Sequence, residues 1–203
     1  MSRRLLIATR NQHKLQEIQK ILHDYPVQLI SLNDIPPLPE VVEDGESFAE
    51  NAVKKALENA RLSGELTLAD DSGLMVDALQ GAPGVYSARY SGPDASDESN
   101  NQKLLRELKN IPLEERGAQF VCVIAAADPQ GKVRTVQGIC RGHITYQPCG
   151  EGGFGYDPLF IPEGYSCTFA ELIPEEKNAI SHRGRALRQI QTLLAEWIPL
   201  ELK

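Results

Sequence analysis

Two apolar segments joined by a short turn constrain the fold of this chain more than any other feature of its sequence. Residues 119–140 read QFVCVIAAADPQGKVRTVQGIC, with an Asp-Pro-Gln-Gly turn at residues 128–131 between two strand-like runs. Strands joined by so short a turn pair antiparallel. Upstream, strand-like and helical segments alternate, as they do in parallel sheets. We therefore expect an α/β fold with a central mixed β-sheet flanked by helices.

One helix upstream of this pair is strongly marked. Residues 47–64, SFAENAVKKALENARLSG, begin with Ser47 and Glu50 at the spacing of a capping box and end at Gly64, a typical C-terminal stop. Before it, the apolar spacing predicts a short strand at Leu5–Ala8 and a helix at Lys14–His23.

Further elements are predicted downstream of the marked helix. The apolar runs Leu66–Ala69 and Leu74–Val76 predict two strands separated by an Asp-Asp-Ser-Gly turn. Thr168 and Glu171 have the spacing of a second capping box, and residues 181–197 carry apolar side chains at helical spacing. We expect the chain to end in an amphipathic helix.

Length, charge and cysteine usage limit the class of function. The chain has 203 residues, 41% of them hydrophobic, and a net charge of −7. We expect one domain over residues 1–203 and no nucleic-acid partner, since no broad basic surface is predicted. The run Leu5–Ala8 is too short for a signal sequence or a membrane span. Four cysteines without metal-binding spacing are typical of reduced, mostly buried thiols in a cytoplasmic protein.

The segment ATRNQHK, residues 8–14, is a candidate phosphate site. It joins the first predicted strand to the first helix, where free backbone N–H groups and the helix dipole attract anions. Thr9 and Asn11 add neutral donors, and Lys14 adds a positive charge. The segment is not a Walker A loop. Thr and Asn are also common helix caps, so the residues alone leave both interpretations open.

Four carboxylates form a candidate metal site. Glu43 and Asp44 precede the marked helix, and Asp70 and Asp71 end a predicted strand. Mg²⁺ bound to phosphates uses one or two carboxylates and takes its other ligands from water and substrate. Asp also favours turns, but a turn needs only one, and two adjacent carboxylates repel each other. We favour the metal site, and expect Asp70 to raise the proton affinity of Asp71.

The segment GEGGFG, residues 150–155, matches the GxGxxG pattern of dinucleotide-binding folds. That pattern must follow a strand and open a helix, whereas prolines flank this segment on both sides. We reject the dinucleotide interpretation. A glycine-rich turn that presents Phe154, Tyr156 and Asp157 remains. It could stack on a base and bind its edge, or be a plain β-turn with a core Phe.

Cations gather at the start of the last predicted helix. Within EEKNAISHRGRAL, residues 175–187, the residues Ser181, His182 and Arg183 begin the helix, and Lys177 lies just upstream. Cations at a helix N-terminus oppose the dipole, so an anionic ligand is favoured over a solvated charged run. No nucleophile-elbow motif accompanies the histidine, which argues against a catalytic triad.

Together these segments resemble the inosine triphosphate pyrophosphatase family. The matching blocks, in family order, are ATRNQHK, EDGESFAENAVKKA, ADDSGL, GAPGVYSARY, GGFGYDP and EEKNAISHRG. The resemblance implies a hydrolase that converts dITP, ITP and XTP to the monophosphate and pyrophosphate, which keeps them out of DNA and RNA. It also implies an elongated mixed sheet in two lobes with the site in a central cleft, and a homodimer.

The resemblance also implies roles for individual residues. Asp71 matches the general base and, with Glu43, a ligand of the cofactor Mg²⁺. The implied substrate-binding residues are Thr9, Arg10, Asn11, Gln12, His13 and Lys14 for the triphosphate, Lys55 and Ser72 near the phosphates, Phe154, Gly155, Tyr156 and Asp157 for the nucleoside, and Lys177, His182 and Arg183 for the base and its 6-oxo edge.

One position departs from the family pattern, and two other functions remain open. Many relatives have Gly at the position of Arg10, where Arg would be costly if φ were positive; we expect instead that Arg10 adds charge near the phosphates. A related pyrophosphatase for modified pyrimidines or methylated GTP is disfavoured by the GGFGYDP and SHRG blocks. A non-catalytic nucleotide- or RNA-binding module is disfavoured by the acidic charge and the carboxylate pair.

Overall fold

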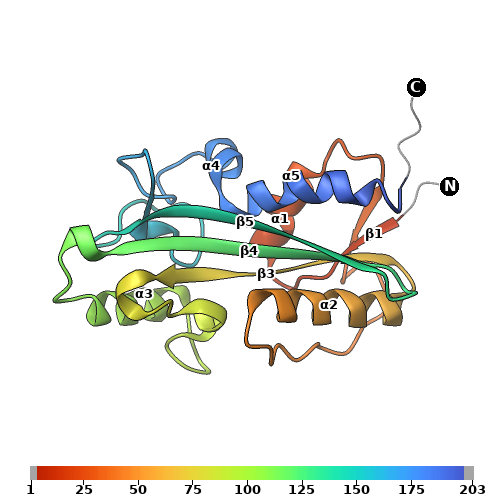
Figure 1. The fold of residues 1–203 in the computed structure, drawn as a ribbon, viewed down its shortest axis with the longest axis horizontal. Coiled ribbons are helices and arrows are strands. Elements are labelled where there is room, and N and C mark those ends of the chain that lie inside the picture. Colours follow the sequence, from red (N-terminus) through yellow and green to blue (C-terminus); the bar gives the residue numbers. More distant parts are fainter. Residues whose placement is uncertain (1–3, 199–203) are drawn as a thin grey trace. The chain divides into compact units, whose positions relative to one another are not determined.

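The computed structural model describes residues 4–198, which contain one six-stranded sheet (Figure 1). Its elements, in chain order, are β1 (Arg4–Ile7), α1 (Gln12–Ile21), β2 (Gln28–Ser31), α2 (Phe48–Ser63), β3 (Leu66–Val76), η1 (Asp77–Leu79), η2 (Gly84–Arg89), α3 (Asp97–Glu107), η3 (Leu113–Glu115), β4 (Gly117–Ala127), β5 (Val133–Ile144), η4 (Asp157–Leu159), β6 (Phe160–Pro162), α4 (Pro174–Ile180) and α5 (His182–Leu194), where η marks a 3₁₀ helix.

The sheet is mixed, as predicted. Its strand order is β2-β1-β3-β4-β5-β6. Strand β1 pairs in parallel with β2 and β3, and Leu5 lies opposite both Leu29 and Leu66. Strand β5 pairs antiparallel with β6. The predicted turn joins the neighbouring strands β4 and β5, and in it the Gly131 N–H donates to the Asp128 carbonyl at 3.0 Å.

The described chain divides into two compact units. Unit 1 comprises residues 4–71, 122–138 and 184–198, and unit 2 comprises residues 72–121 and 139–183. Strands β3, β4 and β5 each contribute residues to both units.

Unit 1 has its core between the strands and two helices. Side chains of β1, β3 and β4 on one face of the sheet pack against α1 and α5, whose buried residues include Ile18, Leu187, Ile190 and Leu194. Helix α2 lies on the other side of the strands from α1 and α5 (Figure 1). It buries a stripe of small residues, among them Ala52, Ala56 and Ala60.

Unit 2 has a separate, more aromatic core. Phe120, Phe160 and Phe169 form it together with apolar residues of β3, β5 and η4. The Phe120 and Phe160 rings meet edge to face, with centroids 4.8 Å apart. Helix α3 contributes Leu104 to this core, and its C-cap residue Leu108 also enters it, which fixes the helix against the sheet.

The strongly marked helix begins and ends where its caps predict. The Ser47 hydroxyl accepts from the Glu50 N–H, and Gly64 ends α2 with φ of 73°. The reciprocal half of the capping box is displaced by one residue, because the Glu50 carboxylate accepts from the Glu46 N–H at 2.7 Å.

The prediction of two strands separated by an Asp-Asp-Ser-Gly turn is wrong. Residues 66–76 form one continuous strand, β3, of 11 residues. Successive side chains of a strand point to opposite faces, so the two adjacent carboxylates, Asp70 and Asp71, each bind a partner on a different side. With those partners the charges are accommodated inside a strand, and no turn is needed.

The second predicted capping box starts no helix. The Glu171 carboxylate does accept from the Thr168 N–H at 2.7 Å, but α4 begins only at Pro174, which restricts Ile173 before it to an extended conformation. The amphipathic C-terminal helix is confirmed and begins at His182. Within residues 4–198, no helix combines the length and apolar character needed to cross a membrane. All four cysteines are free, and Cys122 and Cys140 are buried.

Candidate functional site

The predicted phosphate loop is ordered by its own side chains. The Asn11 side chain caps α1 by accepting from the Lys14 N–H at 3.1 Å, and the Thr9 hydroxyl accepts from the Asn11 N–H at 3.2 Å. Gln12 and His13 follow, exposed, in the first turn of α1. The capping interpretation of this segment is therefore correct, and it leaves the phosphate interpretation open.

Arg10 adopts an unstrained backbone. Among the described residues other than glycine, only Gln80 has a positive φ, so the arginine carries no left-handed penalty. Its guanidinium donates to the Leu38 carbonyl at 3.1 Å. The side chain thus anchors the irregular segment between β2 and α2 to the candidate phosphate loop.

Lys14 reaches from α1 to the sheet. Its ammonium lies 3.0 Å from the Asp70 carboxylate, whose side chain is 2% exposed. This ion pair places a positive charge over the face of β3 that is covered by α1. The sequence placed Asp70 in the candidate metal site, but it did not predict this ion pair with Lys14.

Asp71 is held on the opposite face of the same strand. Its carboxylate accepts from the Asn51 side-chain amide of α2 at 3.1 Å. Burial raises the pKa of Asp71, against the charges of Lys55 and Lys14, which lower it. The expected rise in proton affinity is thus present, but burial, rather than the neighbouring Asp70, is its chief cause.

Lys55 interacts with a cluster of three carboxylates, those of Glu43, Asp70 and Asp71. Its ammonium lies 2.7 Å from Glu43 Oε1. Burial alone would lower the pKa of Lys55, but the charges of Asp70, Glu43 and Asp71 outweigh burial and raise it. The cluster therefore binds a cation already, in the form of a lysine side chain.

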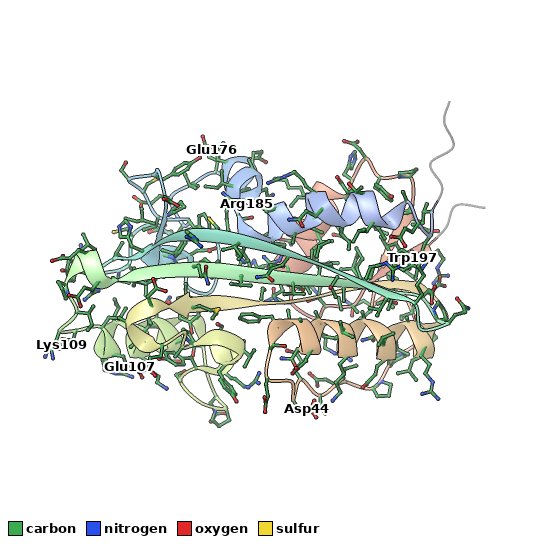
Figure 2. All side chains as sticks on the ribbon, in the orientation of Figure 1. Asp44, Glu107, Lys109, Glu176, Arg185 and Trp197 are labelled. Atoms are coloured by element: carbon green, nitrogen blue, oxygen red, sulfur yellow. The ribbon has the colours of Figure 1, made fainter. Side chains whose placement is uncertain are left out.

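This donor set fits Mg²⁺ only in combination with a substrate. No group of three or more His, Cys, Asp and Glu within residues 4–198 is arranged to hold a metal ion by itself. Two carboxylates completed by phosphate oxygens and water are a common Mg²⁺ site, and Glu43 and Asp71 can supply them. Asp44, labelled in Figure 2, instead pairs with Lys54 at 2.6 Å on the surface.

The glycine-rich turn of unit 2 is built around a buried ion pair. Asp157 accepts from the Phe154 N–H at 2.8 Å, and the same carboxylate oxygen lies 2.7 Å from the Lys177 ammonium. The side chains of this pair are 4% and 7% exposed. Phe154 is half-buried, and the Lys177 ammonium lies 4.8 Å from its ring centroid. As predicted, no α-helix starts at residues 150–155.

Tyr156 does not present its ring as the sequence predicted. The ring is 4% exposed within the aromatic core, and its hydroxyl donates to the Ser87 carbonyl at 2.9 Å. Apolar burial with a satisfied hydroxyl is the usual role of a core tyrosine. The ring and hydroxyl of Tyr156 are therefore not presented to a ligand, and its carbonyl accepts from the Leu159 N–H at 3.0 Å.

The start of α5 brings two predicted residues together. The Arg183 guanidinium donates to the Ser72 hydroxyl at 2.9 Å and lies 5.7 Å from the Phe154 ring centroid. His182 stacks on the core residue Phe120, with ring centroids 4.7 Å apart. Both His182 and Arg183 are buried, so they are fixed by unit 2 and do not form a solvated charged run.

Sequence reasoning missed several residues that hold the predicted ones. Asn51 gave a signal, since it is an amide on the stripe of small residues along α2. Asp97 and Asn101 of α3 gave none. They bind the backbone of Gly155, which is 58 and 54 residues away in sequence.

The chain resembles proteins of one family over nearly its whole length. A model described as the Ham1 family matches residues 5–193. A protein of Geobacter sulfurreducens named dITP/XTP pyrophosphatase is 56% identical over 198 residues, which cover 98% of this chain and 99% of that protein. One of the same name from Desulforamulus reducens is 52% identical, with 94% and 95% covered.

Solved structures agree with the sequence comparison. A HAM1 protein from Coxiella burnetii superposes with a TM-score of 0.87 at 42% identity, covering 96% of this chain and 99% of that one. A nucleoside-triphosphatase / dITP/XTP pyrophosphatase from Mycobacterium abscessus gives a TM-score of 0.76 at 49% identity, covering 92% and 98%.

Proposed function

This chain belongs to the Ham1 family, and on that premise we propose that it is a Mg²⁺-dependent pyrophosphatase that converts dITP, ITP and XTP to the monophosphate and pyrophosphate. The observation that carries the proposal is the cluster at Lys55, whose ammonium lies 2.7 Å from Glu43 and feels the negative charges of Asp70 and Asp71 as well. A cluster of this kind suits the hydrolysis of a phosphoanhydride, whereas a binding module gains nothing from carboxylates beside a phosphate. Removing such nucleotides keeps them out of DNA and RNA.

Glu43 and Asp71 would hold the metal in this proposal. When bound, Mg²⁺ withdraws charge from the phosphate oxygens and so favours attack by water. Asp71 orients that water and accepts its proton, a role favoured by the raised pKa of the buried carboxylate. Asn51 holds the same carboxylate in place through its amide.

The triphosphate would be bound by unit 1. Lys14, Lys55 and the backbone N–H groups of residues 9–14 supply positive charge to the leaving pyrophosphate. Both lysines are bound to carboxylates in the structure. Nucleotide binding would therefore exchange these carboxylate partners for phosphate partners. Before the nucleotide binds, the carboxylates keep the two lysines in place.

The base would be bound by unit 2, with selectivity set by donors to its 6-oxo group. Phe154 offers a ring face, while Arg183, held by Ser72, offers N–H groups. One buried donor left unpaired costs roughly 1–3 kcal/mol, which corresponds to about ten- to hundredfold discrimination against a 6-amino purine. Because ATP is abundant, we propose that a second donor, from His182 or a backbone N–H, meets the same edge.

We further propose that residues 1–203 act as one catalytic domain, which is supported by the contribution of β3, β4 and β5 to both units. Such an enzyme would work in the cytoplasm, where the nucleotide pool is. We also propose a homodimer, as the family resemblance implies. Sedimentation equilibrium at micromolar concentration tests the dimer, and a single species of about 22 kDa would contradict it.

Pyrophosphate release tests the activity directly. We expect rapid release from dITP, ITP and XTP with Mg²⁺, slow release from dATP and dGTP, and none without metal. Asp71→Asn should abolish turnover, while the surface variant Asp44→Asn, which removes a carboxylate outside the cluster, should retain it. Equally slow pyrophosphate release from all five nucleotides would contradict the proposal and indicate a modified nucleotide as the substrate.

A further inference from the structure

Both backbone polar groups of Gly155 are bound by a single helix. The Gly155 N–H donates to the Asp97 carboxylate at 2.6 Å, and the Gly155 carbonyl accepts from the Asn101 side-chain amide at 3.0 Å. Asp97 and Asn101 are four residues apart, so they lie on one face of α3. Gly155 has φ of 62°, in the left-handed region. The peptide groups on either side of this residue are therefore fixed from outside the turn.

Helix α3 is itself firmly held. Ser96 and Ser99 form a reciprocal capping box at its start. The Asn100 side chain accepts from the Ser91 N–H at 2.7 Å and donates to the Ser87 carbonyl at 3.3 Å. Leu104 enters the aromatic core of unit 2. A helix anchored at its cap, flank and core face can position a loop precisely enough for recognition.

Burial of the Asn101 side chain is unfavourable unless its N–H donor forms a hydrogen bond. Its side chain is buried at 8% exposure, and within the described residues its Oδ1 atom has no hydrogen-bond partner. An apolar residue of similar size would avoid this cost. The hydrogen bond from the Asn101 side-chain nitrogen to the Gly155 carbonyl offsets this cost. If the amide were flipped, its oxygen would face the carbonyl oxygen of Gly155 and the two would repel each other.

We infer that Asp97 and Asn101 are positioning residues for base recognition, acting through Gly155 on the neighbouring Phe154. This inference rests on the proposed function. Without these two hydrogen bonds the turn samples other conformations, and the ring face of Phe154 is in place for only part of the time. A competent state that is only partly populated weakens apparent binding by that fraction. The reacting phosphates are bound by other residues, so the chemical step is unaffected.

Four variants test the inference. Asp97→Ala removes an exposed acceptor from α3, while Asp97→Asn retains an oxygen that can still accept from Gly155. Asn101→Asp replaces the donor by an oxygen facing the Gly155 carbonyl. Glu98→Ala is the matched control, because Glu98 also places a carboxylate in the first turn of α3 but bonds only to the Gln102 side chain among the described contacts.

The kinetic expectation is a change in KM and selectivity at constant kcat. Asp97→Ala and Asn101→Asp should raise KM for dITP about three- to tenfold, the factor expected for loss of one hydrogen bond. The ratio of kcat/KM for dITP over dATP should fall by a similar factor. Asp97→Asn should recover most of the wild-type KM, and Glu98→Ala should match wild type. In amide NMR spectra, the Gly155 proton should lose its carboxylate-induced downfield shift in Asp97→Ala.

The outcomes separate the two proposals. If wild type hydrolyses dITP but folded Asp97→Ala retains its KM and selectivity, the positioning role is overturned alone. A fall in kcat equal to the fall in selectivity would also overturn it. If wild type fails to hydrolyse dITP at all, the proposed function and this inference fail together. If Asn101→Asp does not fold, the two variants of the exposed residue Asp97 still test the positioning role.

Discussion

The carboxylates of Asp70 and Asp71 are adjacent in β3 but bind partners from different helices. Asp70 lies 3.0 Å from the Lys14 ammonium of α1, whereas Asp71 accepts from Asn51 of α2 at 3.1 Å. Alternation along a strand directs neighbouring side chains to opposite faces, so the two charges need not share one side of the sheet. The Lys55 ammonium compensates both charges, since each of the two carboxylates raises the pKa of Lys55.

Replacing Lys55 should strengthen metal binding while it weakens catalysis. Lys55→Met removes the cation that pairs with Glu43. One unit charge at about 4 Å contributes about 1 kcal/mol even in water, so Mn²⁺ affinity without nucleotide should rise about three- to tenfold. Titration calorimetry measures this affinity, and pyrophosphate release should fall in the same variant. Lys54→Met, which frees only the surface residue Asp44, is the control; unchanged Mn²⁺ affinity in Lys55→Met would contradict the prediction.

Asp71 should titrate above an ordinary aspartate and Asp44 below one. Burial raises the pKa of Asp71, whereas the Lys54 ammonium lowers that of Asp44. Metal ligation needs the ionised carboxylate, so the affinity of the protein for the metal should fall as the pH falls through the raised pKa of Asp71. Carboxyl-carbon NMR titration of the metal-free protein measures both values. The Asp71 pKa should rise further in Asn51→Ala, which removes a hydrogen bond to the carboxylate, and a downward shift there would refute the assignment.

Removing only one member of the buried pair of Asp157 and Lys177 should strongly lower the free energy of unfolding. Asp157→Asn leaves the ammonium buried without that carboxylate, at a cost of about 3–5 kcal/mol of unfolding free energy. Adding Lys177→Met should recover part of this loss without restoring dITP binding. Urea denaturation of the two single variants and the double variant gives the coupling energy, and additive losses would show that the pair is not coupled.

Arg10 should contribute little to stability through its backbone. Its φ is not positive, so Arg10→Gly gains no relief of strain and instead frees the unfolded chain, costing about 0.4–1 kcal/mol relative to Arg10→Ala. Thermal denaturation of these two variants compares them directly. Greater stability of Arg10→Gly than of Arg10→Ala would indicate a strained backbone at this position.

The sequence predicted most of what depends on local chemistry. The caps of α2, the turn between β4 and β5 and the rejection of a dinucleotide loop each follow from residues within one short segment, since turns and helix ends are set by neighbouring side chains. The mixed sheet follows from that turn together with the alternation of strands and helices upstream. Six blocks in family order indicated the activity, which the comparisons support. The turn expected within β3 failed because two Asp residues look like turn residues until their partners are known.

Partners that lie far apart in the chain were decided only by the tertiary structure. The sequence by itself determined which carboxylates, lysines and glycines the protein carries, and that they suit phosphate and metal chemistry. Only folding decided that Lys55 pairs with Glu43, that the Tyr156 ring enters the core, and that α3 binds both polar groups of Gly155. The reason is physical: burial and hydrogen-bond geometry belong to contacts between distant segments, and no local pattern encodes which buried donor will meet which acceptor.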